Sequence, residues 1–158
     1  MTDDAASLCA RGRALAAEGR FADAEAAYRE ALRRTPDDVQ AHLALGLCLR
    51  RQRRPAEAAA AFREAVRVQP GSAQARVELG GALFEQEKYA EAAGAFAEAI
   101  GLRPDFAKAH VSLGLALARQ GEYARAEAAF REALRRKPGD PVARANLGTV
   151  LRRQRKAA

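Results

Sequence analysis

The stretch "AEAAYREALRRTPDD" at residues 24–38 returns almost unchanged as "AEAAFREALRRKPGD" at residues 126–140. The two copies start 102 residues apart, which is three times 34, and weaker copies start at the two intervening positions, Ala58 and Ala92. The phrase therefore occurs four times with a fixed period of 34 residues. A period of this length predicts an array of stacked supersecondary units.

The composition favours helices. Of the 158 residues 49% are hydrophobic, but only 6% are aromatic, and alanine, leucine, glutamate and arginine dominate the sequence. These four residue types are strong helix formers, and no alternating strand pattern occurs among the few β-branched residues. We expect an all-α fold.

The N-terminus and the cysteines favour a reducing compartment. The first residues, "MTDDAASLCARGR", contain no apolar core of a secretory signal, and no run of about 18 apolar residues could span a membrane. Cys9 and Cys48 are the only cysteines and have no metal-binding spacing, so we interpret them as small buried thiols. We expect a cytoplasmic protein.

Prolines set the frame of the repeat. They recur every 34 residues from Pro36 to Pro138, and each ends a helical pattern because proline cannot continue the backbone hydrogen-bond ladder. Asp38, Ser72 and Asp140 follow three of them and can cap the next helix. The resulting units are 5–38, 39–72, 73–106 and 107–140, followed by a single helix at 141–155.

Each unit contains two apolar-periodic segments, which predict a helix hairpin. In the second unit, Leu45, Gly46 and Leu49 lie in the first segment, and Ala58 and Phe62 lie in the second. Spacings of three and four residues place each set on one helical face.

A glycine recurs in the middle of every first helix, where it costs about 0.5–1 kcal/mol relative to alanine. We expect the missing side chain to let the second helix approach closely through small alanines, while an aromatic ring fills the space between units. The glycines are Gly12, Gly46, Gly80, Gly114 and Gly148; the alanines are Ala24, Ala58, Ala92 and Ala126; the rings are Tyr28, Phe62, Phe96 and Phe130.

The pattern L-G-x2-L, followed by A-x3-F/Y-x2-A and a proline, resembles the tetratricopeptide repeat (TPR) and covers residues 5–151. The resemblance implies a right-handed α-solenoid of stacked antiparallel hairpins, which forms one domain over residues 1–158. It also implies that the last helix is the terminal cap that a repeat array needs for solubility.

The sequence departs from the family pattern at two kinds of position. The large aromatic residue of the first helix is replaced, for example by His42, Arg76 and His110. Arg53 stands where the family has a turn glycine, so we expect the turn of the second unit to differ from the others.

No motif for catalysis, cofactor binding or metal binding occurs in the sequence. His42 and His110 occupy the same packing slot in different units, so they should lie far apart and have structural roles. We therefore expect a protein that is not an enzyme and that needs neither a cofactor nor a metal.

In the family that the sequence resembles, the first helices line a concave groove that accepts peptide segments of partner proteins. The resemblance thus implies a non-catalytic adaptor or scaffold for a protein or peptide segment, because an apolar strip with a polar rim suits such recognition. The alternative for several apolar positions is that they only pack between helices. The apolar groove positions are Leu43, Leu47, Val77, Phe84, Val111 and Leu115, and the polar positions are Arg13, Gln40, Arg50, Gln74, Glu78, Lys108, Ser112 and Asn146.

The groove lacks the carboxylate clamp of chaperone-binding TPR proteins. That clamp uses lysine, asparagine and arginine side chains, whereas the matching positions here include Cys9, Ala44 and Glu78. Glu78 would repel a carboxylate, so we expect a different kind of partner.

The charge is banded along the chain. The net charge is +7; the second unit (+4), the fourth unit (+3) and the tail (+5) are basic, whereas the third unit is −3. Two arginine-rich runs, 102 residues apart, are expected at the helix–helix turn edge of the array. This basic edge comprises Arg51, Arg53, Arg54, Arg152, Arg153, Arg155 and Lys156.

Three interpretations of the basic edge stay open. It is solvated surface, it binds an acidic partner segment, or it meets the acidic third unit of another copy in a self-assembling scaffold. Nucleic acid or an anionic membrane is the least favoured partner, because the basic residues alternate with acidic ones and the rings have packing roles.

Overall fold

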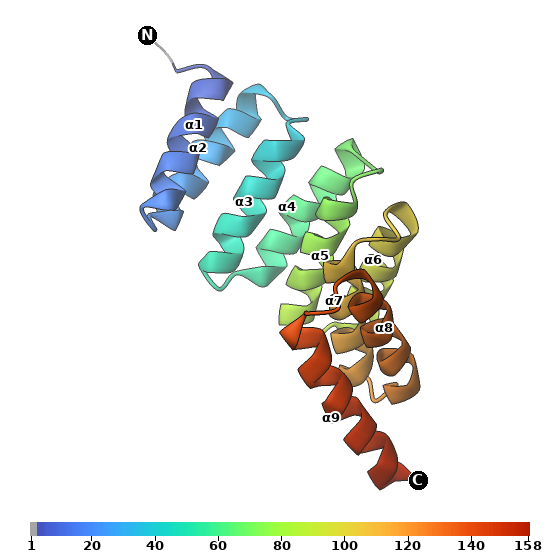
Figure 1. The fold of residues 1–158 in the computed structure, drawn as a ribbon. Coiled ribbons are helices and arrows are strands. Elements are labelled where there is room, and N and C mark those ends of the chain that lie inside the picture. Colours follow the sequence, from blue (N-terminus) through green and yellow to red (C-terminus); the bar gives the residue numbers. More distant parts are fainter. Residues whose placement is uncertain (1–2) are drawn as a thin grey trace.

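The computed structural model describes residues 3–158, which form nine α-helices connected by short turns (Figure 1). The first eight helices pair as antiparallel hairpins, and the ninth stands alone at the C-terminal end. The helices are α1 (Ala5–Ala17), α2 (Phe21–Arg34), α3 (Val39–Arg51), α4 (Pro55–Val68), α5 (Ala73–Glu85), α6 (Tyr89–Leu102), α7 (Ala107–Arg119), α8 (Tyr123–Arg136) and α9 (Pro141–Ala157).

The hairpins stack in chain order, with the N-terminus at one end of the array and α9 at the other (Figure 1). Each helix packs against the helices that precede and follow it in the chain. This arrangement confirms the predicted all-α solenoid, in which each unit contacts only its neighbours. None of the described helices is both long enough and apolar enough to cross a lipid bilayer.

Side-chain caps start several first helices, as predicted. The carboxylate of Asp38 accepts a hydrogen bond from the backbone N–H of Ala41 at 3.0 Å, and Ser72 and Asp140 cap α5 and α9 in the same way. Each cap satisfies one of the N–H groups that have no partner within the helix. The N-cap position of α7 is Phe106, which offers no such acceptor.

The glycines in the middle of the first helices face the aromatic ring of their own hairpin. A β-carbon on Gly114 would lie 2.7 Å from the ring of Phe130, which is closer than real side chains approach each other. Alanines were expected as the partners of the glycines and rings between the units; the structure instead seats each ring against a glycine within one hairpin. The pairs are Gly12–Tyr28, Gly46–Phe62, Gly80–Phe96 and Gly114–Phe130.

The turn of the second hairpin keeps the geometry of the others, so the expectation that it differs is wrong. Arg53 has a φ of +61° in the left-handed region, where Gly19 and Gly121 have φ values of +77° and +78°. Its N–H donates to the carbonyl three residues earlier, as the N–H of each glycine does. Glu87 of the third hairpin adopts the same conformation, with a φ of +60°. Packing of the hairpin therefore imposes this conformation on residues with a side chain, at a cost in strain.

Candidate partner-binding groove

The first helices of the hairpins form the inner row of the array. Cα atoms of successive first helices, such as α3 and α5, approach within 8 Å of each other, whereas no two second helices approach this closely in the part of the chain that the structure describes. The array therefore bends toward its first helices, and side chains of α1, α3, α5, α7 and α9 share the concave face.

The predicted groove residues lie at three depths in this face. The polar positions are mostly open, whereas the apolar positions range from open to fully covered. Arg13, Gln40, Leu47, Gln74 and Lys108 are exposed; Leu43, Arg50, Phe84, Ser112, Leu115 and Asn146 are half-buried; Val77, Glu78 and Val111 are buried.

Val77 and Val111 belong to the hydrophobic core of the third and fourth hairpins. Only 2% of Val77 is exposed, so this side chain stabilises the stack and is not open to a partner. For these two positions the structure favours the packing alternative. Leu47, which is 45% exposed, is the most open of the apolar groove residues.

One position of each first helix follows the concave face from end to end. By the period of 34 these residues are Arg13, Leu47, Gly81, Leu115 and Thr149. The guanidinium of Arg50 lies over Gly81, because a β-carbon there would be only 3.3 Å from its Nη1 atom. The middle of the groove therefore presents a leucine, a guanidinium and a second leucine in sequence.

Glu78 is a buried carboxylate that joins three first helices. Its side chain is only 8% exposed and accepts hydrogen bonds from Arg50 of α3 at 2.9 Å, Lys108 of α7 at 3.2 Å and Gln74 of α5 at 2.6 Å. Arg50 also donates to Glu85 at 3.0 Å. Two cations thus balance two carboxylates, which a buried charge requires.

Sequence reasoning missed two neighbours of the groove, Tyr89 and Arg119. The Arg119 guanidinium lies 5.4 Å from the ring centre of Phe84 and 5.7 Å from that of Tyr89, and it donates a hydrogen bond to the Tyr89 hydroxyl at 3.2 Å. The two rings meet edge to face at 5.0 Å. The available signal was that Phe84 and Tyr89 flank the α5–α6 turn and that Arg119 follows Glu85 by one period.

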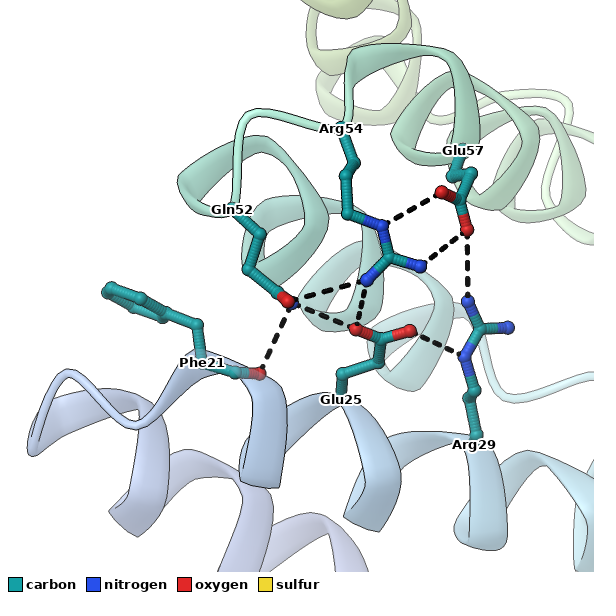
Figure 2. A network of polar contacts seen from close by, with 6 residues as sticks. All are labelled: Phe21, Glu25, Arg29, Gln52, Arg54 and Glu57. Atoms are coloured by element: carbon teal, nitrogen blue, oxygen red, sulfur yellow. Dashed lines mark hydrogen bonds and ion pairs between the residues drawn. The ribbon is translucent and has the colours of Figure 1, made fainter.

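The first basic run is tied into a polar network between the first two hairpins (Figure 2). Arg54 pairs with Glu25 at 2.6 Å and with Glu57 at 2.6 Å, while Gln52 and Arg29 each donate to Glu25 at 2.9 Å. Burial raises the pKa of Glu25, but the hydrogen bonds from Gln52, Arg29 and Arg54 outweigh it and hold that pKa below its ordinary value. Arg54 is therefore a link between hairpins.

The second basic run lies within a helix. Residues 152–156 belong to α9, so the prediction of a turn edge is wrong for this run. Ala157 stands one repeat position after Lys156, where Pro55 starts the second helix of an earlier unit, and no second helix follows in the described chain to force a turn. Arg152 donates to Thr149 at 3.1 Å. Of the remaining basic-edge residues, Arg51 lies 6.0 Å from the Phe21 ring, and Arg53, Arg153, Arg155 and Lys156 are exposed.

The two histidines hold the loops between hairpins. The Nε2 atoms of His42 and His110 lie 2.7 and 2.8 Å from the carbonyl oxygen of the proline six residues earlier, and Arg76 and Arg144 donate to the equivalent proline carbonyls. The replacement of an aromatic residue thus adds one polar contact at four junctions. Within residues 3–158, no group of three His, Cys, Asp or Glu side chains could hold a metal ion.

Cys9 and Cys48 are buried free thiols, as the sequence predicts. Burial raises the pKa of both, so at neutral pH they stay protonated and behave as small apolar groups.

Solved structures match the fold over nearly the whole chain. The MamA protein is 27% identical with a TM-score of 0.89, and the match covers 95% of this chain and 82% of that chain. The pilF protein of Pseudomonas aeruginosa is 25% identical with a TM-score of 0.83, covering 96% and 69%. YrrB, described as a TPR protein with an unusual peptide-binding site, is 22% identical with a TM-score of 0.81, covering 96% and 78%, and shows the fold alone. No curated protein matches the sequence.

The sequence profile described as Tetratricopeptide repeat matches residues 9–73, 50–105 and 77–141. These overlapping matches include most of the chain, and the helix pairs within them are the hairpins described above. The chain belongs to the tetratricopeptide repeat family.

Proposed function

We propose that this protein is a non-catalytic scaffold that holds a segment of a partner protein on its concave face. The observation that carries the proposal is Leu47, which is 45% exposed on the inner helix row and lies one turn after Leu43 on the same face. Leu115 occupies the equivalent position two units later and is half-buried. Two leucines on a concave surface suit apolar side chains of an extended or helical segment.

The charges of the groove define the partner further. Arg50 and Lys108 balance Glu78 and Glu85 in the middle of the groove, so this part favours an uncharged segment. Arg13, at the N-terminal end of the same face, forms no ion pair within residues 3–158. The preferred partner segment therefore has apolar residues for Leu47 and Leu115 and an acidic residue toward α1.

Peptide binding by another protein of this fold, as described for YrrB, supports the class of function but identifies no partner.

The test compares two leucines that are equally exposed. Leu47 on the concave face and Leu102 at the end of the second helix α6 are each 45% exposed, so neither substitution by glutamate should disturb folding. Proteins captured from the native host by the unaltered chain, by Leu47→Glu and by Leu102→Glu are quantified by mass spectrometry. Circular dichroism of both variants verifies that they fold.

We expect a partner that is retained by the unaltered chain and by Leu102→Glu but lost with Leu47→Glu. Its purified binding segment should then bind the chain with about tenfold or greater loss on Leu47→Glu. Equal retention of every protein by the two variants would remove the concave groove as the binding surface.

A further inference from the structure

Helix α9 repeats the packing face of the other first helices, but no second helix covers it. Gly148 and Leu151 occupy the repeat positions of Gly46 and Leu49. Gly46 is buried and Leu49 is 1% exposed, whereas Gly148 and Leu151 are partly exposed. A β-carbon on Gly148 would meet only Arg152, at 3.7 Å, where the equivalent atom on Gly46 would overlap an aromatic ring. The seat for a ring is therefore present on α9 and open.

The four hairpins of this chain show what covers such a face. In each, a second helix places a small residue and, four positions later, an aromatic ring against the glycine. In α6 these residues are Ala92 and Phe96, which are 0% and 2% exposed, followed by the buried Ala99. The complement of the α9 face is thus a helix with the pattern small-x3-aromatic-x2-small.

The charge of α9 adds a second requirement. Residues 141–158 contain five basic residues and no acidic residue. A hollow of about 330 Å³ on this helix is lined by Thr149, Arg152, Arg153 and Lys156. A helix that carries acidic side chains matches this charge, and a basic helix does not.

We propose that the uncovered face of α9 is a docking site for one acidic amphipathic helix of another protein, whose aromatic ring seats against Gly148. The ring takes the place that Phe62 has against Gly46, and acidic side chains of the partner pair with Arg152, Arg153 or Lys156. This site lies outside the Leu47 groove and does not depend on the proposed function.

The chain itself supplies matched probes for this site. A synthetic peptide of residues 89–102 has the packing pattern of a second helix and only two charged side chains, both acidic, Glu91 and Glu98. A peptide of residues 123–136 has the same pattern with four arginines and two glutamates. Labelled peptides with blocked termini are titrated with the full chain at low salt, and fluorescence anisotropy is recorded.

We expect the peptide of residues 89–102 to bind about tenfold or more tightly than that of residues 123–136. Phe96→Ala in the first peptide should weaken its binding at least about tenfold, because the ring is the anchor. In the full chain, Gly148→Leu fills the seat and should have an equally large effect. Gly94→Leu is the matched control: Gly94 is also an exposed helical glycine, with no atom within 4 Å of an added β-carbon.

Several results would overturn the proposal. They are no binding of the peptide of residues 89–102, unchanged binding to Gly148→Leu, and unchanged binding of the Phe96→Ala peptide. Equal affinity of both peptides would overturn the acidic character of the partner. A dimer of the unaltered chain in sedimentation that Gly148→Leu disrupts would assign the face to a second copy. Leu47→Glu should leave peptide binding unchanged, so this site and the groove are tested separately.

Discussion

Helices α3 and α9 carry nearly the same letters in two environments. Gly46, Leu49 and "RRQR" at residues 50–53 recur 102 residues later as Gly148, Leu151 and "RRQR" at residues 152–155. In the second hairpin these letters end a helix and form a turn, whereas in α9 the helix continues through them. The following helix therefore decides between turn and helix at this position, since the local sequence is the same.

What the two helices share is their contact with the preceding hairpin. Gln52 donates to the backbone of Phe21 and to Glu25, and Gln154 donates to the backbone of Tyr123 and to Glu127. What differs is the contact with the following helix, which only α3 has. A solenoid is stabilised by each unit and its interfaces separately, so equivalent substitutions should have unequal effects at the two places.

The largest difference is expected for the buried leucine. Leu49→Ala should lower the free energy of unfolding by about 2–5 kcal/mol, because Leu49 is enclosed between α3 and its neighbours. Leu151→Ala should cost less than about 1.5 kcal/mol, because one side of Leu151 already faces solvent. Urea unfolding followed by circular dichroism measures both. Equal losses would mean that α9 is as well covered as α3.

The glycines should respond with opposite signs. Gly46→Ala places a methyl group against the Phe62 ring, so we expect a loss of about 1–3 kcal/mol from overpacking. Gly148→Ala meets no ring and improves helix propensity, so it should raise the free energy of unfolding by about 0.5–1 kcal/mol. The same unfolding experiment compares them. A loss of stability in Gly148→Ala would show that the seat on α9 is already filled.

The network around Glu25 should make the junction of the first two hairpins sensitive to acid. Because its pKa is lowered on folding, its contribution is complete above the ordinary value of 4.5 and is lost as the pH falls through the folded-state pKa. Thermal unfolding between pH 7 and pH 3 should show a smaller acid loss for Glu25→Gln, with a difference of about 1 kcal/mol.

The equivalent Glu127 provides the control for this pH effect. It accepts from Gln154 and pairs with Arg131, but no counterpart of Arg54 reaches it among the described ion pairs. Glu127→Gln should therefore reduce the acid loss less than Glu25→Gln does. Identical pH profiles for the two variants would exclude Arg54 as the source of the difference.

The smallest effect concerns the strained turn. Arg53→Gly should stabilise the protein by about 0.5–1 kcal/mol, because glycine adopts the left-handed conformation without steric cost. Arg155→Gly, at the equivalent position inside α9, should destabilise it by up to about 0.5–1 kcal/mol, because glycine weakens a helix. Calorimetric melting of the two variants should shift in opposite directions; shifts of the same sign would contradict the difference between turn and helix.

The period of 34 was sufficient to predict the hairpins, their boundaries and the equivalence of positions in different units. It could not predict environment. Val77 and Val111 are equivalent to the half-buried Leu43, yet they are buried, because depth depends on side chains from neighbouring hairpins. The turn at Arg53 and the helix at Arg155 differ for the same reason: the deciding contact lies in another element.

The candidate groove was predicted by helix face but not by chemistry. Glu78 was expected to confront a partner, and it is instead enclosed by Arg50, Lys108 and Gln74. These residues come from three units and are not related by the repeat, so no comparison of equivalent positions brings them together. Networks that break the internal symmetry are visible only in three dimensions.

The Glu78 network also has a mechanical consequence. A solenoid behaves as a spring, and its stiffness at each point depends on the links between successive coils. Because Arg50 and Lys108 reach Glu78 from opposite sides, three consecutive coils are clamped together at the centre. The position equivalent to Glu78 in α9 is Asn146, which bonds only within its own helix. Tension applied to the two ends should therefore extend the terminal coils first and leave the central curvature in place.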